Sequence, residues 1–257
     1  MSFPNEPGFY RVRALGRDEL FYIGQTGRTL RERVRDLIRN SMKDDMPYND
    51  PHTAGPSLWA WRDAEALIFE VSCSTSNMDT RERKGYEDYL LWRYHLEKGD
   101  STLCNHGRFH PLYEKSRNRS SGFRGGRLKE GLNSASGRSL EPLKRIGISG
   151  EPGWMGLSWI SGGELLQLKP STIPEKKGLY LILGEEMLYI GQSNNLRDRL
   201  KTHQKKDWRL EGVRCSYYPM PDDTLPHQIK EYESNLIGAY YEETESIPKH
   251  QYANLGQ

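Results

Sequence analysis

The chain has 257 residues, of which 35% are hydrophobic and 11% aromatic; this suffices for one large or two small globular domains and excludes a largely disordered protein. Its apolar runs are too short to cross a bilayer and its first residues lack the pattern of a secretion signal, so we expect a cytoplasmic protein without a membrane partner. The formal net charge is +2, and the three cysteines form no CxxC pair or Cys/His cluster, which argues against a disulfide framework and a zinc site.

The first predicted element is a β-hairpin near the N-terminus. Two runs rich in aromatic and β-branched residues, 8–12 and 20–25, flank a short polar turn that contains Gly16. An amphipathic helix follows, which Thr29 is placed to cap and whose apolar stripe is bordered by Arg33. The stripe consists of Leu30, Val34, Leu37 and Ile38.

A long segment, 40–66, separates this helix from the next predicted one. It contains Trp59 and Trp61, which alternate as in a strand. We expect both in the core rather than on a base-stacking surface, because tryptophan more often has a packing role.

The next predicted helix, 86–94, carries an acid on its apolar face. At 100° per residue, Glu87 shares that face with Leu90 and Tyr94. Burying an unpaired carboxylate is costly, so the pattern indicates a metal ion or an arginine beside it. A structural salt bridge to Arg33 is one explanation, and a functional site is the other.

The segment from 106 to 146 is strongly basic. Ten Lys or Arg residues face three Glu, a local excess of seven positive charges. DNA fits such an excess because each phosphate contact releases counterions; the alternative is a solvated linker kept soluble by its charge. The stretch 119–138 is rich in Gly, Ser and Arg, and we expect it to be mobile without DNA. The side chains expected to bind DNA are Arg117, Arg119, Arg124, Arg127 and Lys129.

The second half of the chain repeats these elements in the same order. Residues 178–182 and 188–192 predict a second β-hairpin around a polar turn. The amphipathic helix after it is capped by Asn194 or Asn195, and a later helix, 232–240, repeats the pattern Tyr-Glu-x-x-Leu-(Leu/Ile)-x-x-Tyr.

The repeat also preserves the polar residues. Arg199 takes the place of Arg33, and Glu233 takes the place of Glu87 on the later helix. The same misplaced acid found twice favours function over a structural salt bridge. Each copy closes on an asparagine in a strand-like segment, and singly each would be an ordinary turn residue. These two residues are Asn105 and Asn254.

Together these residues resemble the GIY-YIG nuclease superfamily, and the arrangement is similar to that of tandem bacterial GIY-YIG proteins. The matched regions span about residues 8–110 and 175–257. The first family motif matches Gly8-Phe9-Tyr10 and Gly178-Leu179-Tyr180, and the second matches Tyr22-Ile23-Gly24 and Tyr189-Ile190-Gly191.

The resemblance implies a role for each matched residue. Tyr10 and Tyr180 would orient or deprotonate a water molecule, Arg33 and Arg199 would bind the scissile phosphate, and Glu87 and Glu233 would each bind Mg²⁺ or Mn²⁺. The implied catalytic residues are Tyr10, Tyr22, Arg33, Glu87 and Asn105 in the first copy and Tyr180, Tyr189, Arg199, His203, Glu233 and Asn254 in the second.

The first copy departs from the family pattern at one position. The histidine that many members carry one turn after the arginine matches His203, whereas the first copy has Leu37. His52, in the insertion, is either a replacement or an ordinary loop residue.

The resemblance implies an α/β (α+β) fold of two small GIY-YIG modules, each a three-stranded, mostly antiparallel sheet flanked by helices. We place the modules at 1–110, with the insertion at 40–66, and at 175–257, joined by a basic linker and connector at 111–174. The expected function is that of a metal-dependent DNA endonuclease with two active sites in one chain, as a monomer or homodimer. Restriction or defence, repair and mobile-element processing all fit such an enzyme. The alternative is a DNA-binding or scaffold protein in which one module, the N-terminal one sooner than the C-terminal one, is inactive.

Overall fold

The computed structural model describes residues 3–50 and 53–253 and has the mixed α and β composition expected from the sequence. The chain divides into two compact units, which are described separately here. The first comprises Met1–Arg83, Glu97–Leu140 and Leu225–His227, and the second comprises Lys84–Leu96, Glu141–Thr224 and Gln228–Gln257. This partition differs from the boundaries expected from the sequence, because the connector is divided at residue 140 and residues 84–96 belong to the second unit.

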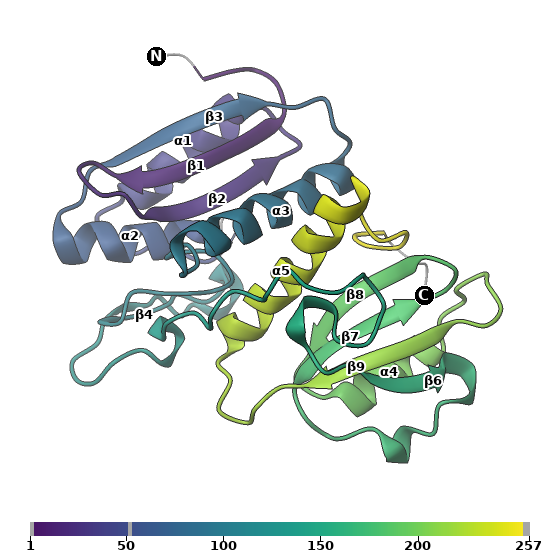
Figure 1. The fold of residues 1–257 in the computed structure, drawn as a ribbon. Helices are drawn as coiled ribbons and strands as arrows, with labels where there is room; N and C mark the ends of the chain where they lie inside the picture. Colours follow the sequence, from purple (N-terminus) through teal and green to yellow (C-terminus); the bar gives the residue numbers. More distant parts are fainter. Residues whose placement is uncertain (1–2, 51–52, 254–257) are drawn as a thin grey trace. The chain divides into compact units, whose positions relative to one another are not determined.

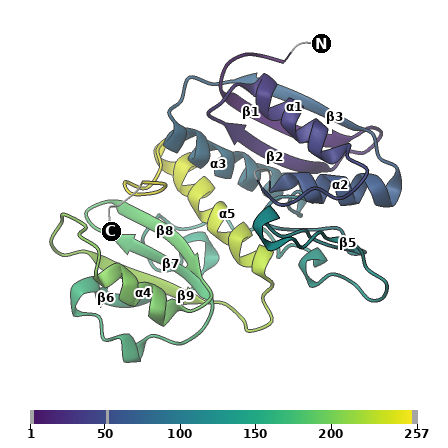
Figure 2. The ribbon, with the colours of Figure 1, turned by 180° about the vertical axis from the view of Figure 1, so that it is seen from behind.

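The first unit is built on a three-stranded antiparallel sheet, as expected. Its main elements are β1 (Gly8–Ala14), β2 (Leu20–Thr26), α1 (Leu30–Ser41), α2 (Ala54–Glu65) and β3 (Phe69–Thr75). The strand order is β2-β1-β3, and α1 lies across one face of the sheet (Figure 2). Tyr10 and Val12 on β1 share a core cluster with Leu30, Val34 and Leu37, three of the four residues in the stripe predicted from the 3.6-residue period. The fourth, Ile38, is exposed, so the buried face of α1 is narrower than expected. Thr29 caps α1, its hydroxyl accepting the backbone N–H of Glu32 at 3.2 Å.

The insertion forms a helix and not a strand. Trp59 and Trp61 both lie on α2, so the strand indicated by their alternation is wrong. Both residues pack in the core, as expected. Two residues apart on a helix, they point about 200° from one another and enter different clusters. Trp61 packs edge-on against Phe21, with ring centroids 5.5 Å apart, whereas Trp59 packs against Tyr113.

The basic connector is organised in its first half. Its residues form a small hairpin, β4 (Tyr113–Glu114) and β5 (Gly126–Arg127), and two single 3-10 turns, Arg119–Ser121 and Ser134–Ser136. The five side chains expected to bind DNA are all exposed on the hairpin, its loop or the residues just after it.

The second unit contains a four-stranded antiparallel sheet, one strand more than expected. Its elements are β6 (Ile160–Glu164), β7 (Gly178–Leu183), β8 (Met187–Ser193), α4 (Leu196–Gln204), β9 (Arg214–Pro219), nearly all of α5 (Pro226–Thr244), the middle of α3 (Thr80–Lys98) and the 3-10 turns Trp154–Gly156, Leu165–Gln167 and Pro170–Thr172. The strand order is β6-β9-β7-β8 (Figure 1). The additional strand, β6, comes from the connector and pairs with β9, whose edge would otherwise present unpaired backbone groups.

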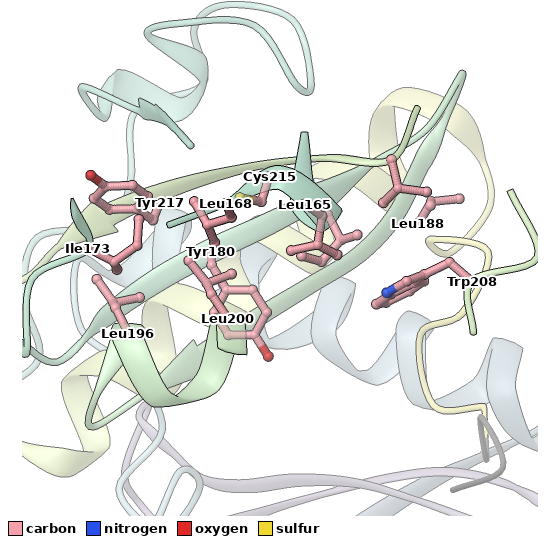
Figure 3. Close-up of a cluster of buried hydrophobic side chains, with 12 residues drawn as sticks. Leu165, Leu168, Ile173, Tyr180, Leu188, Leu196, Leu200, Trp208, Cys215 and Tyr217 are labelled. Carbon is pink, nitrogen blue, oxygen red and sulfur yellow. The ribbon is translucent and has the colours of Figure 1, made fainter. Parts of the chain in front are cut away.

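Helix α4 covers one face of this sheet (Figure 2), and Asn195 caps it by accepting the N–H of Asp198. Leu196 and Leu200 on α4 pack against Tyr180 and Ile182 on β7, and Figure 3 shows the Tyr180 ring standing on the sheet beside Leu200. The buried stripe of α4 thus agrees with the amphipathic pattern of the sequence.

Within the second unit, α3 and α5 cross at close range. A Cβ added to Gly238 on α5 would lie 2.8 Å from both the carbonyl oxygen of Asp88 and the Cβ of Trp92 on α3. The glycine therefore allows the two helix backbones to approach one another and brings the acids of α3 near those of α5. Among residues 3–50 and 53–253, no helix is long and apolar enough to span a membrane.

Candidate active site

Two tyrosines of the second unit lie on one face of its sheet. Tyr180 on β7 pairs with Gly191 on β8, and Tyr189 pairs with Ile182, so the two rings are diagonal neighbours. Their centroids are 6.0 Å apart and their planes differ by 17°. The hairpin register alone thus places both phenols together.

Two side chains of α4 converge on the hydroxyl of Tyr180. Arg199 Nε donates to Tyr180 Oη at 3.0 Å, and His203 Nε2 lies 2.9 Å from the same oxygen. Because the two residues are four apart on the helix, they share one face and reach one atom. Arg199 remains exposed to solvent, whereas His203 is buried.

The environment of His203 keeps its ring neutral. Burial, with smaller contributions from Lys206 and Arg199, lowers its pKa to about 3. Trp208 covers the ring, with centroids 5.5 Å apart, and its indole N–H donates to the backbone carbonyl of His203.

The buried Nδ1 of His203 has no hydrogen-bond partner within the described part of the chain. A buried lone pair without a donor is tolerated better than a buried N–H without an acceptor. We therefore assign the neutral tautomer with its proton on Nε2, in which Arg199 and His203 both donate to Tyr180 Oη. The hydroxyl proton of Tyr180 is then directed away from both donors.

Glu233 on α5 completes this group of side chains. Its pKa is raised to about 8, first by burial and then by the nearby Asp88, while the backbone N–H of Gln192 and the positive charges of Arg199 and Lys230 act in the opposite direction. The negative charge of Glu233 also raises the pKa of Tyr189 and of Tyr180, although burial is the first cause for both phenols. Glu233 thus lies within electrostatic range of both tyrosines and the arginine.

Asp88 is a second acid of this region that sequence reasoning did not single out. It accepts hydrogen bonds from Ser234 Oγ, at 2.7 Å, and from Tyr252 Oη. Burial raises its pKa to about 7. The sequence holds only a weak sign of it, namely that Asp88 follows the repeated glutamate of α3 where α5 has Ser234.

In each unit a side-chain amide binds the backbone of the isoleucine that follows the second tyrosine, Ile23 in the first unit and Ile190 in the second. In the first unit Asn105 Oδ1 accepts the N–H of Ile23 at 3.0 Å, and Asn105 Nδ2 donates to the carbonyl of Ile23 at 2.8 Å. In the second unit the N–H of Ile190, the residue equivalent to Ile23, donates to Gln251 Oε1 at 3.1 Å. Gln251 therefore takes the place of Asn105, three residues before the asparagine expected from the sequence. Asn254 lies outside the described residues.

These bonds indicate a structural role for both amides. The chain before each one runs beside the β2 or β8 strand, with Cys104 N–H donating to Phe21 O and His250 N–H donating to Leu188 O, each at 2.8 Å. The amide of Asn105 in the first unit, or that of the longer Gln251 in the second, then bonds to the backbone of the isoleucine in the Tyr-Ile-Gly segment. Gln251 does not match the residue type of Asn105, so the repeated motif does not point to it, whereas the backbone bonds before it do.

The first unit assembles a similar but smaller group. Tyr10 and Tyr22 have ring centroids 5.9 Å apart, and Arg33 Nε donates to Tyr10 Oη at 2.8 Å. Leu37, which is buried, occupies the position of His203. Glu87 is in the segment of α3 that belongs to the second unit, whereas the second group is complete within its own unit. His52 lies outside the described residues.

The donor set fits a cation held mainly by water. Within residues 3–50 and 53–253 there is no cluster of three or more His, Cys, Asp or Glu side chains that would hold a metal ion. Glu233 is a single carboxylate donor, and burial raises its pKa although Arg199 and Lys230 act in the opposite direction, so a bound cation would offset the cost of its ionised form. A hard cation such as Mg²⁺, which retains several waters, is compatible with one carboxylate.

Models of known protein families, curated proteins and solved structures were compared with the chain, and none of them matches it. The geometry of Tyr180, Arg199, His203 and Glu233 is therefore the basis for the function proposed below.

Gly191 is required for the two phenols to fit, which gives a first prediction. A Cβ at this position would lie 2.5 Å from Tyr180 Cζ and 2.7 Å from Tyr189 Cε1. Gly191→Ala should therefore destabilise the protein by about 1–3 kcal/mol, as overpacking of a core does, and displace Tyr180 from Arg199. Thermal unfolding measures this loss. Gly184→Ala on the β7–β8 turn is the control, since its Cβ would meet the Leu188 side chain at ordinary contact distances of 3.4 Å and more. An equal loss in both variants would contradict the prediction.

Proposed function

We propose that the chain is a metal-dependent DNA endonuclease that hydrolyses phosphodiester bonds at the site of Tyr180, Tyr189, Arg199, His203 and Glu233. The observation that carries this proposal is the convergence of Arg199 and His203 on the hydroxyl of Tyr180, within electrostatic range of the acid Glu233, whose pKa is raised by burial. The GIY-YIG resemblance of the sequence motifs supports the same reaction class.

In this proposal the chain's own residues position the reactants. Two N–H donors on Tyr180 Oη favour a developing negative charge on that oxygen, whereas burial, the larger effect, keeps it a neutral phenol in the protein alone. Arg199 is held by this bond at Nε, and its exposed guanidinium end is available to a phosphate oxygen. His203, neutral at physiological pH, orients Tyr180 and does not add a competing positive charge.

Glu233 would hold the divalent cation. Bound Mg²⁺ or Mn²⁺ supplies charge neutralisation at the phosphate and a coordinated water of lowered pKa. One cation is proposed for this site, because Glu233 is the acid whose charge acts on Tyr180, Tyr189 and Arg199.

A second candidate has one specific observation in its favour. The first unit has Leu37 where the second has His203, and its glutamate belongs to the other unit. This favours a chain in which the first group of residues binds DNA without cutting it. The product formed from supercoiled plasmid with Mg²⁺ distinguishes these cases. A chain with two working sites gives linear DNA, a chain with one working site gives mainly nicked circles, and a chain that only binds DNA gives neither.

Cation binding at Glu233 gives a second prediction, which needs no substrate. The folded pKa values of Glu233 and Asp88, about 8 and about 7, are above their ordinary values, so the stability provided by the protonated acids is present at low pH and is lost as the pH rises through that range. A cation competes with these protons. Mn²⁺ should therefore raise the Tm more at about pH 8.5 than at about pH 6, by mass action on the folded state.

Thermal unfolding of wild type and Glu233→Gln with and without Mn²⁺ measures this effect. The variant should lose the pH-dependent gain, while Glu185→Gln, an exposed acid of the β7–β8 turn, should keep it. Equal gains in wild type and Glu233→Gln would place the cation elsewhere.

A further inference from the structure

We infer that the insertion and the basic connector form a single phosphate-binding arm of the first unit, which holds the DNA backbone without reading bases. The arm is defined as residues 45–50 and 113–130. The inference rests on the proposed function, since DNA is the polyanion that this function supplies. Neither segment carries a motif of the hairpins or helices that repeat along the chain.

The stem of the arm is fixed to α2. Tyr113 on β4 is 0% exposed, and its hydroxyl donates to Asp63 Oδ2 at 2.7 Å. Its ring packs edge-on against Trp59, with centroids 6.0 Å apart. The position of β4 and β5 therefore follows that of the helix, and the loop between them is presented from a buried base.

The loop of the arm is also bound to residues 45–50. Asn49 N–H donates to Arg117 O at 3.1 Å, and Arg119 N–H donates to Asp50 Oδ1 at 2.7 Å. Arg124 Nη1 bonds to Asp45 Oδ2 at 2.9 Å. These bonds join two segments about 70 residues apart in the chain into one surface.

Three arginines of the loop lie over aromatic rings. The guanidinium carbons of Arg119 and Arg124 are 5.9 and 4.9 Å from the centroid of Tyr48, and that of Arg117 is 5.0 Å from Phe123. All three arginines are exposed. Such contacts restrict the rotamers of long side chains before any partner binds, which lowers the entropic cost of binding.

The same contacts favour binding to DNA phosphates over stacking on DNA bases. Proteins that bind single strands through their bases leave aromatic rings open for stacking. Here arginines occupy Tyr48 and Phe123, so these rings present guanidinium groups in place of open faces for stacking. Guanidinium groups match phosphate oxygens, and phosphate contacts position a protein on DNA without specifying sequence.

The test compares salt dependence of binding to duplex DNA. The full chain and its triple variant Arg117→Gln, Arg119→Gln, Arg124→Gln are titrated with two unrelated duplexes of about 30 base pairs, in EDTA and at several salt concentrations. Each phosphate contact contributes about one unit to the slope of log K against log salt, so we expect a slope lower by about three, equally on both duplexes. Arg13→Gln, an exposed arginine paired with Glu70 on the sheet, is the control and should keep the wild-type slope.

Two further measurements separate this inference from the proposed function. Hydrolysis of bis(p-nitrophenyl) phosphate, which is too small to reach the arm, should be equal in wild type and triple variant; its absence in both would contradict the nuclease and leave the arm supported by the slope. An unchanged slope, a loss on one duplex only, or wild-type binding to anionic vesicles in place of DNA would each overturn the arm. Because the three arginines are exposed, a Tm equal to that of wild type is expected and shows that the variant folds.

Discussion

Replacing Glu233 by glutamine is expected to abolish cleavage at the site of the second unit while leaving DNA binding intact. The amide has nearly the shape of the acid but no charge, so the cation loses its anchor and the reaction loses the stabilisation that a Lewis acid gives, several kcal/mol or on the order of 10³-fold in rate. The substitution removes a buried acid whose pKa is raised to about 8. The variant should therefore unfold at a temperature equal to or higher than that of wild type.

The internal repeat provides a matched variant for this experiment. Glu87 occupies the same position of the repeated helix pattern in α3. If both sites work, wild type gives linear plasmid and each single variant, Glu87→Gln or Glu233→Gln, gives nicked circles. If the second site alone works, Glu87→Gln cuts like wild type. Undiminished cleavage by Glu233→Gln would contradict the site proposed here.

Replacing Tyr180 by phenylalanine is expected to reduce cleavage by about 10²- to 10⁴-fold, the range associated with a positioned proton-transfer group. The substitution removes the oxygen on which Arg199 and His203 converge. It also leaves the buried Nε2 of His203 without that partner, a loss of about 1–3 kcal/mol in the free energy of unfolding. Cleavage rates are therefore compared at a temperature where both proteins are folded.

Tyr217→Phe is the control for this variant. Tyr217 is the cross-strand neighbour of Tyr180 on β9, and in Figure 3 its hydroxyl points away from that of Tyr180. It should retain wild-type cleavage. A Tyr180→Phe protein that cuts as fast as Tyr217→Phe would show that the phenol is a packing residue only. Tyr10→Phe makes the same comparison for the first unit, where Arg33 Nε donates to the phenol.

The sequence determined the local geometry of the site. Alternation along 178–192 and the short turn predict a hairpin, and the hairpin register then places Tyr180 and Tyr189 on one face. Helical spacing predicts that Arg199 and His203 share a face, and the sequence offers Asn194 or Asn195 as the cap of their helix, of which the structure shows Asn195. These features depend on neighbours within about 20 residues, for which periodicity and capping are sufficient information.

The tertiary structure alone decided which acids gather around Glu233. Asp88 is 145 positions away in the chain and reaches this region because α3 and α5 cross at Gly238, a contact that depends on the fit of two helix surfaces and leaves no periodic signal. The fourth strand, β6, and the bond between Gln251 and Ile190 have the same origin, since backbone groups of distant segments select their partners by position and not by residue type. Repeated motifs thus supplied the phenols, arginine and glutamate, and helical spacing placed the histidine beside the arginine, whereas the packing of distant segments set the charge around the glutamate.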